Sequence, residues 1–149
     1  MKRLREFLRL PNMERRLLLK AALLLEAIKL GVRLLPFLTL RRLLARAADV
    51  HPRGLRRVER CNFSADRVTW AVETASRHTP GVKTCLAQAL AAQVLLARHG
   101  HPALVRIGVV RGEGGEFQAH AWVESEGAVV IGEAEFERYT PLAGLEKET

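Results

Sequence analysis

The segment "TCLAQALAAQVLLARHG", Thr84 to Gly100, predicts the element around which the expected fold is built. Its apolar residues recur at helical spacing, and the stripe they predict contains Leu86, Ala89, Leu90, Val94 and Ala97. Thr84 is a favourable N-cap residue, and Gly100 is a typical residue just beyond a last helical turn. The stretch therefore predicts a helix that has Cys85 in its first turn and buries an apolar stripe.

Three β-rich runs follow this helix. They read "ALVRIGVVR", "FQAHAWVE" and "AVVIGE", and the glycine-containing turns "GEGG" and "SEG" separate them. Such spacing is typical of an antiparallel meander. We therefore expect an α+β fold, in which a helical N-terminal part is followed by a core whose Cys85 helix packs on a small antiparallel sheet.

Length and charge suggest how the chain is organised. The 149 residues, 48% of them hydrophobic, are enough for a globular domain with a real core. Residues 1–60 carry 16 Lys and Arg against five Asp and Glu, net +11, whereas residues 61–149 carry eight against 11, net −3. We expect a basic amphipathic helical region over 1–60 and the Cys85-containing core over 61–149, packed together as one compact unit.

The basic region is rich in leucine, but Lys20, Glu26, Lys29 and Arg33 interrupt its apolar runs. These runs fall far short of the roughly 20 apolar residues that a membrane span needs, so no transmembrane segment is expected. The pattern instead predicts an amphipathic helix that begins near Pro11 and Asn12 and stops at Pro36. A shorter helix, "LRRLLARAA", comes next, and "SADRVTWAVETASRHT" predicts another with Ser64 as its N-cap.

The basic amphipathic helix admits three interpretations. Its apolar arc packs on the rest of the domain, or it binds a partner or a precursor peptide, or it contacts an anionic membrane or nucleic acid. The chain has no recognisable nucleic-acid-binding motif, so a nucleic-acid partner is not expected. With only two cysteines, Cys61 and Cys85, and no secretory signal pattern, the sequence favours a reducing, cytoplasmic location.

Cys85 is either a small buried hydrophobe or a nucleophile. Unpaired N–H groups at a helix start favour a thiolate and can also hold an oxyanion, so its position suits the second role. Among the histidines, His99 lies at the far end of the same helix, about 20 Å from the sulfur. His120 is the better candidate base because it lies mid-strand between two small alanines.

A third candidate follows from the hairpin. If Glu126 and Gly127 form a two-residue loop, counting outward along the strands places His120 opposite Glu133, within reach of a carboxylate that orients the ring. Glu135 is the alternative acid, and a Cys–His pair without an acid, or with an amide in that role, also stays open. The cysteine and histidine spacings match no zinc pattern, so no metal and no cofactor are expected.

The segments "TCLAQALAAQVLLARHGHPALVRIG" and "AHAWVESEGAVVIGE" resemble the transglutaminase-like leader peptidase of lasso-peptide biosynthesis, the stand-alone protease part of the B-protein. The N-terminal "ERRLLLKAALLLEAIKLGVRLLPF" is similar to its helical part. The resemblance implies a transglutaminase/papain-like core with Cys85 as nucleophile, His120 as general base and acid, and an acidic residue after the histidine strand.

By that resemblance, the activity is cysteine proteolysis that removes the leader from a ribosomally made precursor before macrolactam formation. The implied partners are the leader region of the precursor, a small leader-recognition protein and the macrolactam synthetase. Two other functions keep the same residues in place: a peptide-binding module in which Cys85 is merely buried, and a transglutaminase-like acyltransferase that passes the acyl group to an amine.

Overall fold

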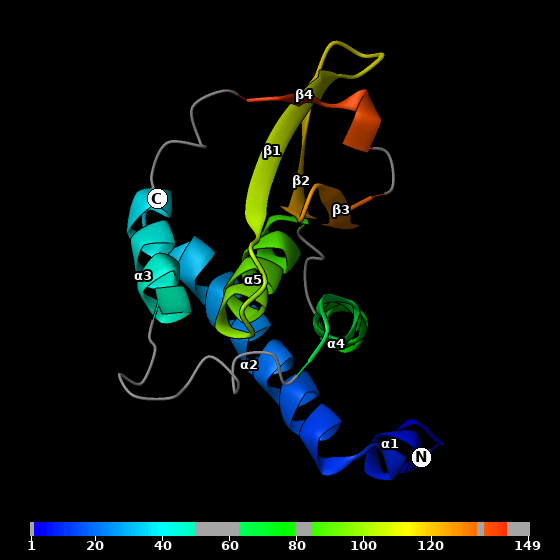
Figure 1. The fold of residues 1–149 in the computed structure, drawn as a ribbon. Coiled ribbons are helices and arrows are strands. Elements are labelled where there is room, and N and C mark those ends of the chain that lie inside the picture. The colour runs from blue at the N-terminus through cyan, green and yellow to red at the C-terminus, as the bar shows by residue number, and fades with distance from the viewer. Residues whose placement is uncertain (1, 50–62, 80–84, 134–135, 143–149) are drawn as a thin grey trace.

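The structure, a computed structural model, describes residues 2–49, 63–79, 85–133 and 136–142. In chain order the elements are α1 (Lys2–Arg9), α2 (Asn12–Leu34), α3 (Phe37–Asp49), α4 (Ala65–His78), α5 (Cys85–Arg98), β1 (Leu104–Arg111), β2 (Phe117–Ser125), β3 (Ala128–Ile131), the 3₁₀ turn η2 (Phe136–Arg138) and β4 (Thr140–Pro141). The molecule is a mixed α+β fold, as the sequence predicts, with α2, α4 and α5 below a small sheet in the view of Figure 1.

The sheet is antiparallel, with its strands in the order β3-β2-β1-β4. The predicted hairpin between β2 and β3 is confirmed, because Ser125 pairs with Ala128 around the two-residue loop. Both loop residues have positive φ, 51° at Glu126 and 82° at Gly127, as a type I′ turn requires. The short strand β4, which pairs with β1, is an addition that no alternating pattern in the sequence predicts.

Helix α5 lies at the centre of the fold. Helices α2, α3 and α4 and strand β2 all contact it, and Figure 1 shows α3 and α4 on either side of it. The predicted single stripe is too narrow, because α5 is buried over most of its surface, including at Ala87, Ala89, Ala91, Ala92, Val94, Leu95 and Leu96. Small side chains make this possible, since alanine lets neighbouring backbones approach closely while leaving no void to fill.

The other predicted helices form with small differences at their ends. Pro11 and Pro36 bound α2, and α4 begins where Ser64 accepts a hydrogen bond at 3.3 Å from the Arg67 backbone N–H. Helix α1, ahead of Pro11, is a further element that the sequence pattern does not predict. None of the helices that the structure describes is long and apolar enough to cross a lipid bilayer.

The N-terminal helices share one hydrophobic core with the rest of the chain. Leu17, Leu25 and Ile28 of α2 are at most 2% exposed and belong to the same buried cluster as Val72 of α4 and Leu96 of α5. The predicted division between residues 60 and 61 falls outside the described residues and stays a prediction. Cys61 and the predicted N-cap Thr84 also lie outside them.

At the C-terminal end of α5, His99 is half-buried with its ring edge against the Phe63 ring, 5.4 Å between centroids. Burial first, and then the positive charges of Lys20, His101 and Arg98, lower the pKa of His99 below its ordinary value of 6.5. Below about pH 6.5, His99 binds a proton more readily in the unfolded chain than in the folded chain. The stability associated with His99 is therefore present above about pH 6.5 and is lost as the pH falls towards its folded pKa.

Replacing Lys20 with Gln should raise the pKa of His99, because Lys20 lowers this pKa more than the charges of His101 and Arg98 do. An NMR titration of the His99 ring measures this directly, with a wild-type pKa below 6.5 and a higher pKa in the variant as the expected result. In parallel, urea unfolding of His99→Gln should show a weaker loss of stability between about pH 7 and pH 5 than the wild type. An unchanged pH dependence in His99→Gln would contradict this assignment.

Candidate active site

Cys85 is the first residue of α5 and its side chain is partly exposed. It packs against the edge of the hydrophobic core rather than inside it. One turn further on, Gln88 Nε2 donates a hydrogen bond to Ser76 Oγ of α4 at 2.5 Å. Because residues three apart share a helix face, Cys85 lies on the side of α5 that meets the C-terminal half of α4. The first turn of α5 is therefore held next to this part of α4.

His120 lies in the middle of β2, directly opposite Gly108 of β1. Its ring is close to two aromatic rings, Trp122 at 6.2 Å and 22° between planes, and Tyr139 at 5.1 Å and 34°. A Cβ on Gly108 would lie 2.9 Å from both the Trp122 ring and the Tyr139 Cβ. Only glycine leaves room at this position, so Gly108 allows the aromatic rings to lie over β1 and enclose the imidazole.

The backbone carbonyl of Gly132 holds the His120 ring. His120 Nε2 and the Gly132 oxygen are 3.0 Å apart, and a carbonyl can only accept, so Nε2 carries the proton in this contact. Nδ1 is then the ring nitrogen with a lone pair, the form that a general base requires. Sequence reasoning assigns the orienting role to a carboxylate, whereas the group observed here is a main-chain oxygen just beyond β3.

Trp122 is 2% exposed and anchors this side of the sheet. Its indole Nε1 donates to Glu124 Oε1 at 3.1 Å, and the other oxygen of that carboxylate accepts from Arg106 Nε at 3.2 Å. Residues at alternate positions of a strand share one face, so His120, Trp122 and Glu124 form a row along β2. The row joins the imidazole to a fixed aromatic ring and a paired carboxylate.

The register that places Glu133 opposite His120 is wrong. The predicted pairing of β2 with β3 agrees with the structure from the hairpin loop to the pair Glu124 and Val129. Beyond it, Val123 pairs with Ile131, so Val130 is an extra residue in β3. Such a bulge shifts every later residue to the other face. Glu133 is exposed, and the His120 hydrogen bond in the described part of the chain goes to Gly132. The catalytic role of Glu133 is therefore not supported by the strand register and stays a prediction. Glu135 lies outside the described residues.

The structure brings His120 together with Trp122, Tyr139 and Gly132, but does not pair it with Cys85. Within the described ranges no hydrogen bond joins the thiol to either ring nitrogen. Ala121 and Val123 belong to the core that the helices cover, so the alternating side chains of β2 place His120 on the opposite face of the sheet. Nucleophile and base lie on neighbouring elements, α5 and β2, that contact each other.

Gly132 and Trp122 have sequence contexts from which their position near His120 could have been predicted. Gly132 follows an apolar β run, and its φ of 78° is a conformation that glycine adopts without strain. Trp122 stands two residues after His120, which predicts a shared strand face. Tyr139 gives no such signal, because its position depends on η2 and on the pairing of β4 with β1.

Comparison with family models places residues 22–144 in the transglutaminase-like superfamily. The match spans most of the chain, from α2 to β4 and beyond, and the chain belongs to this superfamily. Proteins of this superfamily have a cysteine-protease-like fold, and they include cysteine proteases and acyltransferases. Comparisons with curated proteins and with solved structures gave no match.

Gly132→Ala tests how tightly the backbone at the imidazole is constrained. A Cβ there would lie 2.9 Å from the Ala121 carbonyl oxygen and 3.0 Å from the Trp122 Cβ, at a φ of 78°. We expect a loss of unfolding free energy greater than the about 1–2 kcal/mol that the backbone conformation alone costs. Urea denaturation measures this loss.

The matched control is Gly127→Ala, because Gly127 has a similar φ of 82° but no atom within 4 Å of the added Cβ. This variant should show only the conformational cost, and the difference between the two variants reports the contact with β2. Equal losses in both variants would mean that the Gly132 backbone can move away from Trp122, so that it does not hold the ring rigidly.

Proposed function

We propose that this protein is a cysteine peptidase that removes the leader from a ribosomally made precursor peptide of the lasso type. The observation that carries the proposal is that α5 begins at Cys85 within the region that matches the transglutaminase-like superfamily. The resemblance of "TCLAQALAAQ" and "AHAWVE" to leader peptidases supplies the substrate. The proposal includes a cytoplasmic location, where such precursors are made.

In the proposed reaction the Cys85 thiolate attacks the carbonyl carbon of the scissile peptide bond. A tetrahedral intermediate forms, and backbone N–H groups at the start of α5 stabilise its oxyanion. When the C–N bond breaks, protonated His120 gives its proton to the departing amine, which is the new N-terminus of the core peptide. The leader remains attached to the sulfur as a thioester.

Hydrolysis completes the cycle. His120 Nδ1 removes a proton from water, the hydroxide attacks the thioester, and the leader leaves with a free carboxylate while the thiol is regenerated. No oxidant or cofactor is needed. The hydrogen bond from Nε2 to the Gly132 carbonyl supports this role, because it leaves the lone pair on Nδ1.

The reaction requires His120 and Cys85 to come together when substrate binds. Because β2 presents His120 on the sheet face opposite the helices, the proposed reaction requires a rearrangement that moves the imidazole towards Cys85. The contact between α5 and β2 keeps both residues on adjoining elements, and in the described ranges the pairing of β3 with β2 ends at Val123 and Ile131.

Cys85→Ala should abolish cleavage and leave the fold intact, because the side chain is only partly buried and loses one sulfur atom. The precursor encoded beside the gene is mixed with each protein, with and without the leader-recognition protein, and the products are weighed by mass spectrometry. Cys61→Ala is the matched control and should remain active. Full activity of Cys85→Ala in a folded protein would remove the peptidase assignment.

The third catalytic residue can be tested separately. If the Gly132 carbonyl alone orients the ring, Glu133→Gln should retain turnover within about threefold, and His120→Gln should lose it by a factor of about 10³ or more. If Glu133 acts as the acid, its Gln variant should approach the loss seen for His120→Gln, since triad precedents reach about 10⁴. Glu135→Gln distinguishes the remaining acid in the same assay.

Acyl transfer to an amine is the second candidate, because it shares the thioester and differs only in the group that attacks it. The superfamily includes acyltransferases, which supports acyl transfer as the second candidate function. Adding a primary amine to the cleavage assay separates the two. A leader that ends in a carboxylate supports the peptidase, and a leader that ends in an amide at low amine concentration supports the transferase.

A further inference from the structure

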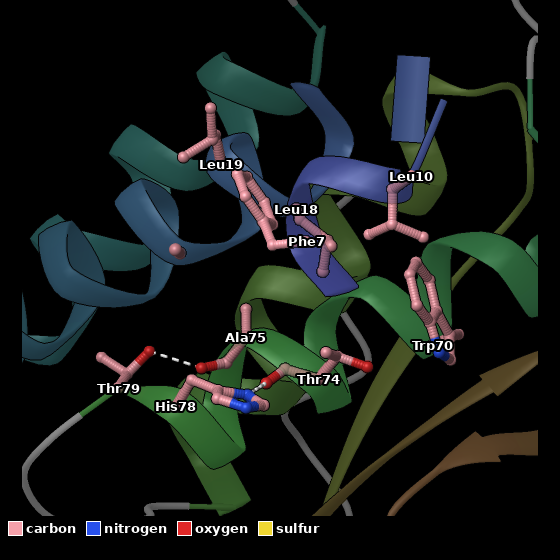
Figure 2. Close-up of a pocket in the computed structure, with 10 residues that line it drawn as sticks. Phe7, Leu10, Leu18, Leu19, Trp70, Thr74, Ala75, His78 and Thr79 are labelled. Atoms are coloured by element: carbon pink, nitrogen blue, oxygen red, sulfur yellow. Dashed lines mark hydrogen bonds between the residues drawn. The ribbon is translucent and has the colours of Figure 1, made fainter. Parts of the chain in front are cut away.

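A groove outside the candidate active site lies between α1, α2 and α4. Its cavity volume is about 520 Å³, and its lining is mainly apolar, including Phe7, Leu10, Leu19 and Trp70. Figure 2 shows Phe7 and Leu19 on one side of the space, and His78 at the end of α4 with the following Thr79 on the other. Leu19 is 53% exposed, a large apolar side chain left open to solvent at the groove.

Specific contacts fix the walls of the groove. The Arg67 guanidinium lies 4.8 Å from the centroid of the Trp70 ring and is also ion-paired with Glu14 of α2, which holds α4 against α2. At the other end, His78 Nδ1 donates to the Thr74 carbonyl at 2.7 Å, and Thr79 Oγ1 donates to the Ala75 carbonyl at 2.6 Å. The ion pair therefore holds α4 against α2 at one end of the groove, and the two hydrogen bonds order the last turn of α4 at the other.

The side of the groove formed by α2 is strongly basic. A second hollow, about 400 Å³, shares Phe7 and Leu19 with the groove and is also lined by Asn12, Arg15 and Arg16. Helices α1 and α2 together carry nine Lys and Arg against three Glu. Two of those Glu, Glu14 and Glu26, form ion pairs with Arg67 and Lys29. An apolar groove beside a positive rim is complementary to a ligand that carries both apolar side chains and carboxylates.

The groove lies close to Cys85 along the chain. Thr79, at its α4 end, is six residues before Cys85, so their Cα atoms are at most about 22 Å apart. The hydrogen bond between Gln88 and Ser76 also holds the first turn of α5 against this part of α4. An extended peptide held in the groove therefore spans this separation with at most about seven further residues.

We infer that this groove docks an acidic amphipathic segment of a peptide. Its large apolar side chains fill the space against Phe7, Leu19 and Trp70, and its carboxylates meet Arg15 and Arg16. Binding by the groove does not depend on the chemistry of Cys85. Its use to deliver a scissile bond to Cys85 rests on the proposed function.

The test uses the full chain and a fluorescein-labelled amphipathic peptide made of leucine and glutamate. Two matched peptides have serine in place of leucine or lysine in place of glutamate. The first should bind in fluorescence anisotropy, and both matched peptides should bind at least about fivefold more weakly. Equal binding of all three peptides, or no binding of the first, overturns the inference.

Leu19→Gln should weaken the complex at least about fivefold, since it removes apolar contact at the groove. Leu30→Gln is the control, because Leu30 is 58% exposed against 53% for Leu19 and lies about 16 Å further along α2. Arg16→Glu should weaken binding strongly at low salt and less at high salt, whereas Arg33→Glu at the far end of α2 should not. Equal effects of variant and control overturn the assignment to this groove.

Two other occupants are separate outcomes that overturn the inference. Self-association that Leu19→Gln abolishes in light scattering would assign the groove to a second copy of the chain. Binding to phosphatidylglycerol vesicles that Leu19→Gln and Arg16→Glu abolish, without peptide binding, would assign it to a membrane surface.

The proposed function can fail independently of the docking site. Cys85→Ala should bind the labelled peptide as tightly as the wild type. With the precursor peptide, Leu19→Gln should raise KM about fivefold and leave kcat within about twofold. If Cys85→Ala still cleaves the precursor while the groove variants behave as expected, the peptidase assignment is wrong and the docking site is supported. If Leu19→Gln binds the labelled peptide as tightly as the wild type while Cys85→Ala is inactive, the docking site is wrong and the peptidase assignment is supported.

Discussion

The burial of α5 on several sides determines where the surrounding helices and the sheet pack. Ala89, Ala91 and Ala92 are fully buried, and α2, α3, α4 and β2 all meet at this helix. Because these neighbours hold α5 along its length, its first residue has little freedom to move. A cysteine at the start of such a helix keeps its position next to α4, which the docking groove requires.

The second fixed point is the imidazole of His120, which depends on backbone geometry more than on charge. Gly108 leaves space for the rings of Trp122 and Tyr139, and Gly132 turns its carbonyl towards Nε2. Both positions depend on the absence of a Cβ, and substitution at either would move a ring or the main chain. The Trp122, Glu124 and Arg106 contacts then stabilise the same face of the sheet. A base of this kind needs no carboxylate to select its tautomer.

Local patterns in the sequence predict most of the fold. Proline positions, the Ser64 cap and the Glu126–Gly127 loop fix helix and hairpin boundaries because each acts over a few residues. The bulge at Val130 and strand β4 depend on contacts between segments distant in sequence, so no local pattern predicts them. The same reason explains the site: Cys85 and His120 are recognisable from their contexts, whereas the partner of His120 changes from Glu133 to Gly132 because one extra residue shifts the register.

Trapping the acyl-enzyme tests the central claim most directly. The protein is mixed with the precursor peptide, the reaction is stopped with acid within its first turnover, and the intact protein is weighed and then digested. The account predicts a mass increase equal to the leader acyl group, located on Cys85 and removed by hydroxylamine, as a thioester requires. Cleavage of the precursor without any adduct on Cys85, or an adduct on another residue, would contradict it.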